Sequence, residues 1–303
     1  NIGDMRNTGH EMALKFNHYG KKGFNWNMGL TYAKNVNLVT KTSPNNPVIF
    51  LDNSYISQRG PRELVSVIRE GYEAAAFFLR ETDGIIKTEE ELEAYKEIDP
   101  AASLGQLRYV DQLTVDTDDD GIPDAGDGKI DQDDKVYKGS GSEDFNMGFN
   151  FGANYKGVDF SMNWYGSQGA EVMNGSKAYA YQSGTHADIY YSWTVVNPLS
   201  DIPYYDGSPN TNSYRDASDY FLEDGSFIRL RNISLGYSLP SKLTDKMKIG
   251  KLRIYVQAQN LLTITNYSGF DPEVGNNGFS SRGIDQGTYP VTSQYKVGLQ
   301  LQF

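Results

Sequence analysis

The last nine residues of the chain alternate strictly between apolar and polar side chains. The apolar set is Tyr295, Val297, Leu299, Leu301 and Phe303, and the residues between them are Lys296, Gly298, Gln300 and Gln302. Because successive side chains of a strand point to opposite faces, this segment is expected to have one apolar and one polar face. Closing strands of bacterial outer-membrane barrels show this pattern, with lipid outside and a polar lumen inside.

The same alternation recurs in four segments upstream. The apolar rows are Phe24, Trp26, Met28, Leu30 and Tyr32; Phe145, Met147, Phe149, Phe151, Ala153 and Tyr155; Val158, Phe160, Met162 and Trp164; and Leu252, Ile254, Val256 and Ala258. The opposite rows are largely asparagine, glycine and glutamine, which suit a water-filled lumen better than a soluble surface. We therefore predict an all-β fold, an antiparallel transmembrane β-barrel, with a soluble all-β sandwich as the alternative.

The composition narrows the class of protein further. The mean hydropathy of −0.57 and the lack of any run of about 18 apolar residues exclude a helical membrane protein. The net charge of −11 argues against a nucleic-acid partner and against a polybasic membrane-surface binder. The chain has no cysteine, so it carries neither disulfides nor thiolate metal sites. No signal peptide opens the chain, which is therefore expected to be a mature product or a piece of one.

Short and long connections alternate along the chain. Strands are expected at 9–19, 24–37, 145–167 (a hairpin), 226–239 and 251–264, and residues 64–80 are expected to hold a strand and an irregular excursion. Thr88 and Glu91 have capping-box spacing, which predicts a short helix to about Ile98. The segment 239–252 is expected to be an inner turn, and the long outer loops are expected at 38–63, 168–225 and 265–288.

An acidic segment at about 111–134 contains a candidate metal site. Carboxylates stand at positions 1, 3, 5, 9 and 12 of a loop with glycine at position 6: Asp116, Asp118, Asp120, Asp124 and Asp127, around Gly121. This spacing wraps oxygen ligands around one Ca²⁺, and we predict a structural calcium site here. A second register, from Asp127 through Asp131 to Asp134, could share Asp127 or compete for it. The alternative is a solvated acidic loop without a metal.

The sequence offers no catalytic constellation. His10, His18 and His186 are far apart and lie in no metal or nucleophile motif. No phosphate-binding glycine loop is present, and no carboxylate pair stands out as a glycosidase couple. We therefore predict that the protein is not an enzyme, with the outer-membrane phospholipase and protease barrels as the enzymatic alternative.

Two arginines conflict with simple alternation in one predicted strand. Arg229, Arg231, Leu235 and Tyr237 all have odd numbers, so in a regular strand their side chains would point to the same face. All four cannot face lipid, because an arginine at the bilayer midplane costs ~2 to 4 kcal/mol. Either a bulge changes the parity or the arginine end of the strand lies above the bilayer.

Four further runs of sequence are distinctive: NTGHE at 7–11, GKID at 128–131, DYFLEDGSFIRLRNISLGYSLP at 219–240 and QNLLTITNYSGFDPE at 259–273. Together they resemble the sequences of one family, the SusC/RagA-type TonB-dependent outer-membrane transporters. The long runs are specific, and the matches extend over the whole chain. The resemblance implies that residues 1–303 are the C-terminal part of a 22-stranded barrel in the cell outer membrane.

The resemblance also implies a function and partners. The family takes up an oligosaccharide or peptide nutrient with energy from TonB, which acts on an N-terminal plug absent from this chain. A SusD-like surface lipoprotein closes the barrel and captures the nutrient. Trp193, Tyr204 and Tyr205 could stack on sugar rings or pack the loops. The rival interpretations are a passive outer-membrane porin and a soluble calcium-binding adhesin.

Overall fold

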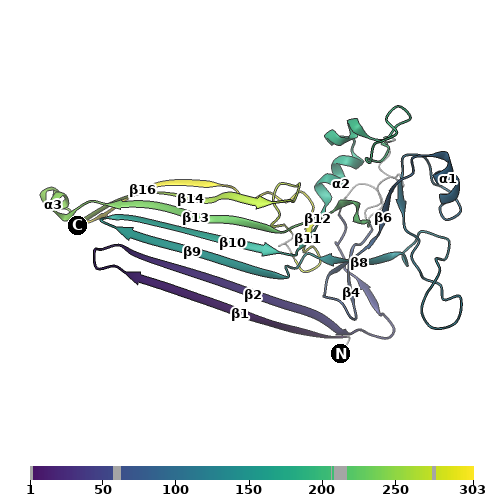
Figure 1. Cartoon of the computed structure of the whole chain (residues 1–303), viewed down its shortest axis with the longest axis horizontal. Coiled ribbons are helices and arrows are strands. Elements are labelled where there is room, and N and C mark those ends of the chain that lie inside the picture. The colour runs from purple at the N-terminus through teal and green to yellow at the C-terminus, as the bar shows by residue number, and fades with distance from the viewer. Residues whose placement is uncertain (1–2, 57–62, 206, 208–216, 275–277) are drawn as a thin grey trace.

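The computed structural model describes residues 3–56, 63–205, 207, 217–274 and 278–303, and its largest element is a seven-stranded antiparallel sheet (Figure 1). In spatial order its strands are β1 (Asp4–Tyr19), β2 (Asn25–Lys41), β9 (Phe145–Tyr155), β10 (Val158–Gln168), β13 (Phe227–Ser238), β14 (Lys251–Thr265) and β16 (Gln294–Gln302). Each strand pairs with its neighbour in an antiparallel register. β1 and β16 form the two edges of the sheet.

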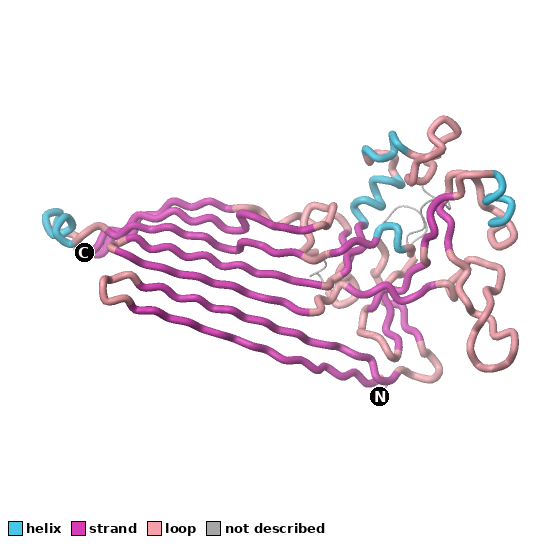
Figure 2. Tube along the Cα trace, viewed as in Figure 1, coloured by secondary structure: helices cyan, strands magenta, loops and turns pink. Residues whose placement is uncertain are grey.

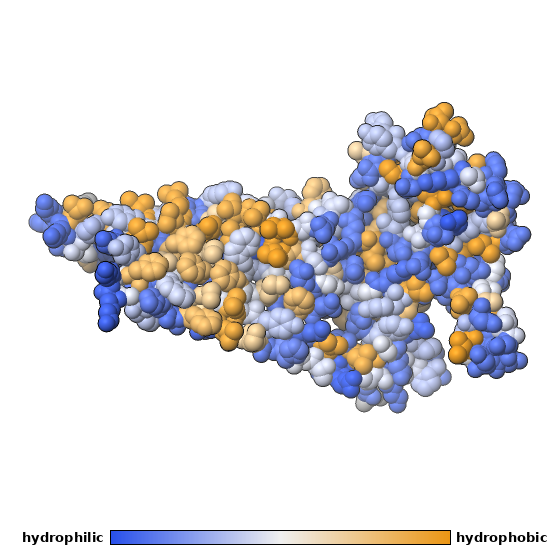
Figure 3. Space-filling model, in the orientation of Figure 1, coloured by the Kyte–Doolittle hydropathy of each residue, from blue (hydrophilic) through white to orange (hydrophobic). Residues whose placement is uncertain are grey.

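The register places the predicted apolar rows on one face of this sheet. Met28 lies opposite Phe151, and Phe151 lies opposite Met162 on the next strand. Apolar side chains gather over a broad area of the sheet (Figure 3). Val297 is 81% exposed and Phe16 is 47% exposed, so no protein layer covers this face. The prediction of antiparallel strands with one apolar face is confirmed.

Tight turns join the strands at one end of the sheet, and the chain ends there too (Figures 1 and 2). Lys156 and Gly157, which connect β9 to β10, both have positive φ angles of 48° and 89°, as a two-residue hairpin of primed type requires. The third turn contains α3 (Ser241–Thr244) and the 3₁₀ turn η3 (Asp245–Met247). It lies within the inner turn predicted at 239–252.

The other end of the sheet carries long loops that fold into small sheets and helices. Three small sheets are formed by β3 (Val48–Phe50), β4 (Ser66–Arg69), β5 (Ala76–Arg80) and β8 (Lys135–Ser140); by β12 (Leu222–Asp224), β11 (Glu171–Asn174) and β15 (Ile284–Asp285); and by β6 (Thr82–Ile85) and β7 (Leu107–Tyr109). The helices are α1 (Glu89–Tyr95), α2 (Gly175–Gln182), η1 (Ala187–Tyr191) and η2 (Asp219–Phe221). No helix among the described residues is long and apolar enough to cross a membrane.

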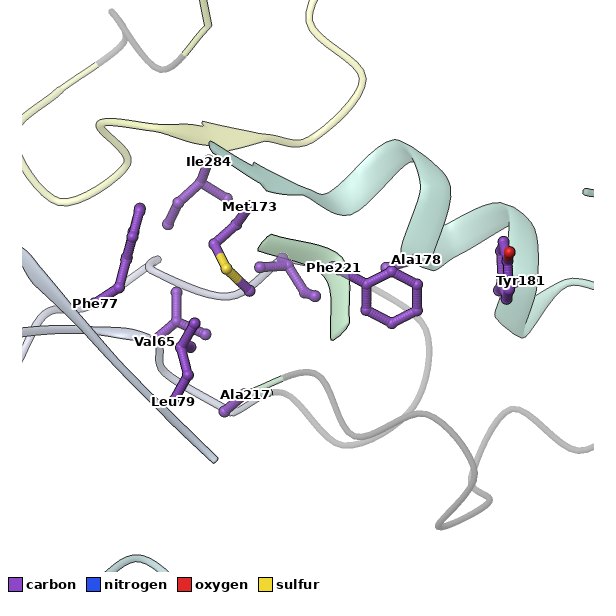
Figure 4. Close-up of a cluster of buried hydrophobic side chains, with 10 residues drawn as sticks. Val65, Phe77, Leu79, Met173, Ala178, Tyr181, Ala217, Phe221 and Ile284 are labelled. Atoms are coloured by element: carbon purple, nitrogen blue, oxygen red, sulfur yellow. The ribbon is translucent and has the colours of Figure 1, made fainter. Parts of the chain in front are cut away.

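The main hydrophobic core lies in these loops and not under the long strands. Its buried members are Ile56, Val65, Phe77, Leu79, Met173, Ala178, Tyr181, Ala217, Phe221 and Ile284. They come from four distant stretches of the chain and converge between α2 and the small sheets (Figure 4). The loops are therefore one packed body, and the strands rely on a different environment for their apolar face.

Local predictions hold at two informative positions. Thr88 accepts a hydrogen bond from the N–H of Glu91, and the Glu91 carboxylate accepts one from the N–H of Thr88, so the predicted capping box is present. In β13 the pairing with β10 skips Arg231: Leu230 pairs with Trp164, and Asn232 pairs with the adjacent Asn163. This bulge changes the parity, so Arg229 is buried while Leu235 is exposed on the apolar face. The first of the two explanations for these arginines is correct.

Candidate functional site

The polar face of the sheet is lined by amides and glycines that interlock across strands. The Asn25 side chain donates a hydrogen bond to Asn154 Oδ1 at 3.1 Å, and Arg253 Nε donates to Asp159 Oδ1 at 2.9 Å. A Cβ on Gly29 would lie 2.7 Å from the amide of Asn150. Glycine on one strand thus leaves room for a long polar side chain that lies flat over it. The result is a smooth hydrogen-bonding wall.

At the loop end of this wall, Arg229 joins the sheet to the loop that follows β14. Its guanidinium donates to Asp271 Oδ1 at 2.5 Å and to Glu273 Oε2 at 2.7 Å, and Glu273 also pairs with Arg231. Thr263 accepts a further hydrogen bond from Arg229 Nε at 2.8 Å. The second carboxylate oxygen of Asp271 accepts from the N–H of Val291. Arg229 therefore holds the first part of the loop that follows β14, and Asp271 links that part to Val291 near the end of the loop.

The acidic segment brings together three of the five predicted metal ligands. Carboxylate oxygens of Asp116, Asp118 and Asp120 lie within 4.8 Å of one another. The N–H of Gly121 donates to Asp116 Oδ2 at 2.7 Å, which holds the pKa of Asp116 below its ordinary value. Asp116 Oδ1 is buried and accepts no hydrogen bond. Gly121 has φ +87°, as the sharp turn in the predicted loop requires.

The other two predicted ligands make contacts elsewhere. Asp124 accepts hydrogen bonds from the Thr117 hydroxyl at 2.7 Å and from the Thr117 N–H at 2.9 Å, and these lower the pKa of Asp124. Asp127 accepts from the N–H of Lys129 at 3.0 Å. The three clustered carboxylates thus lie in the loop that Asp124 helps to close, and Asp127 starts the next turn.

The acidic segment also contains Asp134, the last residue of the second register, and Asp111, which the sequence analysis did not single out. Asp134 is 2% exposed and accepts hydrogen bonds from the N–H groups of Gln112 and Asp131, at 2.8 and 2.7 Å. Burial raises the pKa of Asp134, and the charges of Asp111 and Asp131 raise it further. Asp111 accepts from the N–H of Gly128 at 3.0 Å, and its other oxygen is buried without a partner.

An apolar tip protrudes from the loop body. Val195 and Val196 are the two central residues of a turn closed by a hydrogen bond from the Asn197 N–H to the Thr194 carbonyl at 2.9 Å. With Leu199 they complete a surface whose other members are Tyr190 and Tyr191; four of these five side chains are more than 80% exposed. The Asn197 amide donates to the Tyr191 carbonyl at 3.1 Å, so the tip is held by its own hydrogen bonds. The sequence signal was the adjacent pair of valines inside a polar loop.

The aromatic candidates for sugar stacking mostly pack the loops. Trp193 is 6% exposed and lies in a cluster with Ile85 and Tyr109. Tyr205 packs against the main core, and Tyr204 is 40% exposed beside Gly105. Of the histidines, His10 contacts Tyr32 and His18 stacks on Trp26 near the two ends of the apolar band, while His186 accepts a hydrogen bond from the N–H of Asp188.

Comparison with known proteins gives one consistent result. No family model matches the chain. TonB-dependent receptor P3 of Formosa agariphila is 30% identical over 317 residues, covering all of this chain and 29% of that receptor. TonB-dependent receptor SusC of Bacteroides thetaiotaomicron is 28% identical over 309 residues, covering all of this chain and 27% of SusC. These relatives are receptors and not enzymes.

The solved structures agree. The structure of the RagAB peptide transporter matches all of this chain with a TM-score of 0.75 and 25% identity, over 30% of the matched chain. The RagAB peptide importer in its open-open state matches with a TM-score of 0.74 at the same identity, over 29% of that chain. The chain thus spans less than a third of the length of the proteins that it resembles.

Proposed function

Because this chain belongs to the SusC/RagA-type TonB-dependent receptors, we propose that it is part of an outer-membrane importer of an oligosaccharide or peptide nutrient. On this proposal residues 1–303 form the C-terminal part of a 22-stranded barrel. A plug in the rest of the protein is moved by TonB, and a SusD-like surface lipoprotein captures the nutrient above the loops.

The observation that carries the proposal is the division of the seven-stranded sheet into two unlike faces. The apolar face has no protein cover, as a lipid-facing wall requires, and the other face is an amide and glycine wall suited to a hydrated lumen. The unpaired edges of β1 and β16 would pair with the remaining strands, since a sheet in lipid must satisfy all its backbone groups.

Uptake measurements test the proposal directly. Cells that carry the full-length gene should accumulate labelled oligosaccharide or peptide, whereas cells with the gene deleted should not. A protonophore should abolish accumulation, because TonB draws on the energy of the inner membrane. Uptake that continues unchanged with the protonophore would favour a passive porin. Recovery of the protein in the soluble fraction without detergent would favour an adhesin.

We assign the contact with the lipoprotein to the apolar tip. Lipid does not explain this surface, because the tip lies on the loop body, away from the apolar band of the strands (Figures 1 and 3). Rigid apolar and tyrosine side chains on a fixed turn lose little conformational entropy on binding and are typical of interface centres. The partner is therefore expected to present an apolar pocket to the tip.

Substitution of the tip tests this assignment. Val195→Ser with Val196→Ser should weaken co-purification of the lipoprotein about 10-fold or more, as expected for residues at an interface centre. Ile122→Ser is a matched control, because Ile122 is also an exposed loop residue, at 67% exposure, but lies in the acidic segment. Equal recovery of the lipoprotein with the tip variant and the control would show that the contact lies elsewhere.

We further propose a structural Ca²⁺ at the acidic segment, with Asp116, Asp118 and Asp120 as its central ligands. A buried carboxylate oxygen without a hydrogen-bond partner, at Asp116, supports this proposal, because such an oxygen is costly unless a cation satisfies it. The cluster offers hard oxygen ligands, which Ca²⁺ prefers. Asp124 and Asp127 would join only after a shift of their present hydrogen bonds. The ion would brace the loop and take no part in transport chemistry.

A further inference from the structure

The tight turns at the inner end of the sheet gather seven exposed lysines. They are Lys21 and Lys22 in the first turn, Lys156 in the second, and Lys242, Lys246, Lys248 and Lys251 in or beside the third. Asp245 is the only acidic residue in the segments 20–24, 155–158 and 239–251. No ion pair joins any of the seven to an acidic group in the described part of the chain.

The opposite end of the molecule has the opposite charge. Residues 42–144, which form most of the loop body, contain 24 acidic and ten basic residues. The net charge of −11 is therefore unevenly distributed: the basic residues gather at the end with the tight turns, and the acidic residues are in excess in the loop body. A dense group of positive charges attracts any anion. Which anion binds therefore depends on where the group lies in the protein.

The lysines lie directly beyond the aromatic edge of the apolar band. Phe24, Tyr155 and Tyr237 end that band beside the first, second and third turns; Phe24 and Tyr155 contact each other edge to face, 6.2 Å apart. Lys156 Nζ lies 5.0 Å from the centre of the Tyr155 ring. Aromatic belts mark the level of lipid headgroups, so these ammonium groups stand at the level of the lipid phosphates.

The third turn adds an apolar anchor to the positive charge. Leu243 is 50% exposed and lies between Lys242 and Lys246 on the short helical segment α3–η3. A leucine flanked by lysines at headgroup depth can enter the acyl boundary while its neighbours bind phosphate. We propose that the three inner turns bind anionic phospholipid, with headgroups such as phosphatidylglycerol held by Lys242, Lys246 and Lys248. This inference rests on the membrane orientation in the proposed function.

Lipid retention by the full-length protein tests the inference. Native mass spectrometry in detergent, with added phosphatidylglycerol or phosphatidylethanolamine, should show preferential retention of the anionic lipid. The triple variant Lys242→Gln, Lys246→Gln and Lys248→Gln should bind phosphatidylglycerol ~100-fold more weakly at low salt, since each lysine near an anionic surface contributes about fivefold. Phosphatidylethanolamine binding should not change.

A charge-matched control separates the turn from net charge. Lys41→Gln, Lys96→Gln and Lys129→Gln remove three lysines from the loop end and should leave phosphatidylglycerol retention as in wild type. Equal retention by wild type and the turn variant overturns the inference. So does protection of the turn lysines from acetylation in lipid-free detergent, because another protein segment would then cover them.

Labelling distinguishes failure of this inference from failure of the proposed function. The chain has no cysteine, so Lys22→Cys introduces one thiol into it. A membrane-impermeant maleimide should label that thiol only after the outer membrane is permeabilised. Labelling on intact cells contradicts the proposed orientation and the lipid inference together. Correct labelling without a preference for anionic lipid overturns the lipid inference alone.

Discussion

Arg229 and Asp271 form an almost fully buried ion pair, with 2.5 Å between Nη2 and Oδ1 and exposures of 2% and 5%. The pair joins β13, in the wall of the sheet, to the loop that follows β14. It exists in this form because the bulge at Arg231, opposite β10, turns Arg229 away from the apolar face. One extra residue in β13 thus turns the charge of Arg229, which lipid would exclude, to the side of the sheet where it binds the outer loop.

Loss of one partner should release the loop. Asp271→Asn removes the more buried of the two carboxylates that pair with Arg229 and leaves Glu273, which Arg231 shares. Loss of a buried partner costs at most ~3 to 5 kcal/mol, and the remaining pair with Glu273 reduces that cost. We expect rapid protease cleavage within 266–293 in the full-length protein, with the strands still resistant. Asp83→Asn is the control, because the Arg108–Asp83 pair is largely exposed and should contribute at most about 1 kcal/mol. If both variants resist protease like wild type, the pair does not hold the loop.

Removal of Ca²⁺ should loosen the acidic segment. Asp118→Ala with Asp120→Ala eliminates two of the three clustered carboxylates, and a chelator should have the same effect on wild type. Cleavage between residues 111 and 134 is expected to become faster in both cases. The variant loses the ligands that hold the ion, and the chelated wild type loses the ion that balances the repulsion of its carboxylates. Asp133→Asn is a control in the same segment. The calcium proposal fails if wild type is cleaved at the same rate with Ca²⁺ and with chelator.

Lys135 should give the loop body a distinctive pH dependence. Burial in β8 lowers the pKa of Lys135 from 10.5 to about 8; its ammonium donates to the Leu64 carbonyl at 3.3 Å and lies over the Phe50 ring. Between pH 8 and 10.5 the unfolded chain binds more protons at this site than the folded chain, so stability rises with pH across that window. The full effect is about 3 kcal/mol at most.

A melting series from pH 7 to pH 10 measures this effect on the full-length protein. The wild-type melting temperature should gain a rising component above pH 8 that Lys135→Met lacks, because methionine fills the same space without a proton to lose. Lys129→Met, at an exposed position, should keep the wild-type curve. Identical pH profiles for wild type and Lys135→Met would show that the lysine is solvated.

Alternation and capping made most of the long elements predictable. A period of two over ten or more residues defines both faces of a strand, and the spacing of Thr88 and Glu91 specifies a helix start without tertiary help. The short strands were harder to predict, because β4 and β6 have only four residues each and are fixed by packing around Phe77 and Ile85. At Arg231 the broken alternation indicated a bulge as one of two explanations, but it could not decide between them, because only the pairing with β10 shows the extra residue.

The candidate sites were predictable only in part for a related reason. Loop spacing identified the cluster at Asp116, but it could not show that Thr117 would engage Asp124 or that Asp127 would cap the next turn. The group of lysines at the tight turns could not be predicted from the sequence, because the lysines come from three separate turns that only the strand register brings together. Net charge sums over the chain and carries no information on where the charges meet.

The isolated 303-residue chain should not form a stable closed barrel. β1 and β16 are separated by the width of the sheet, and each presents one unpaired backbone edge, which lipid cannot hydrogen-bond. Seven strands with a glycine-rich inner face also lack the bulky side chains that fill the interior of a small barrel. Expressed alone in detergent, the chain should aggregate or show no heat-modifiable mobility on a gel, whereas the full-length protein should show it. A monodisperse, heat-modifiable species with amide protection along both edge strands would instead establish a small independent barrel and contradict the 22-strand proposal.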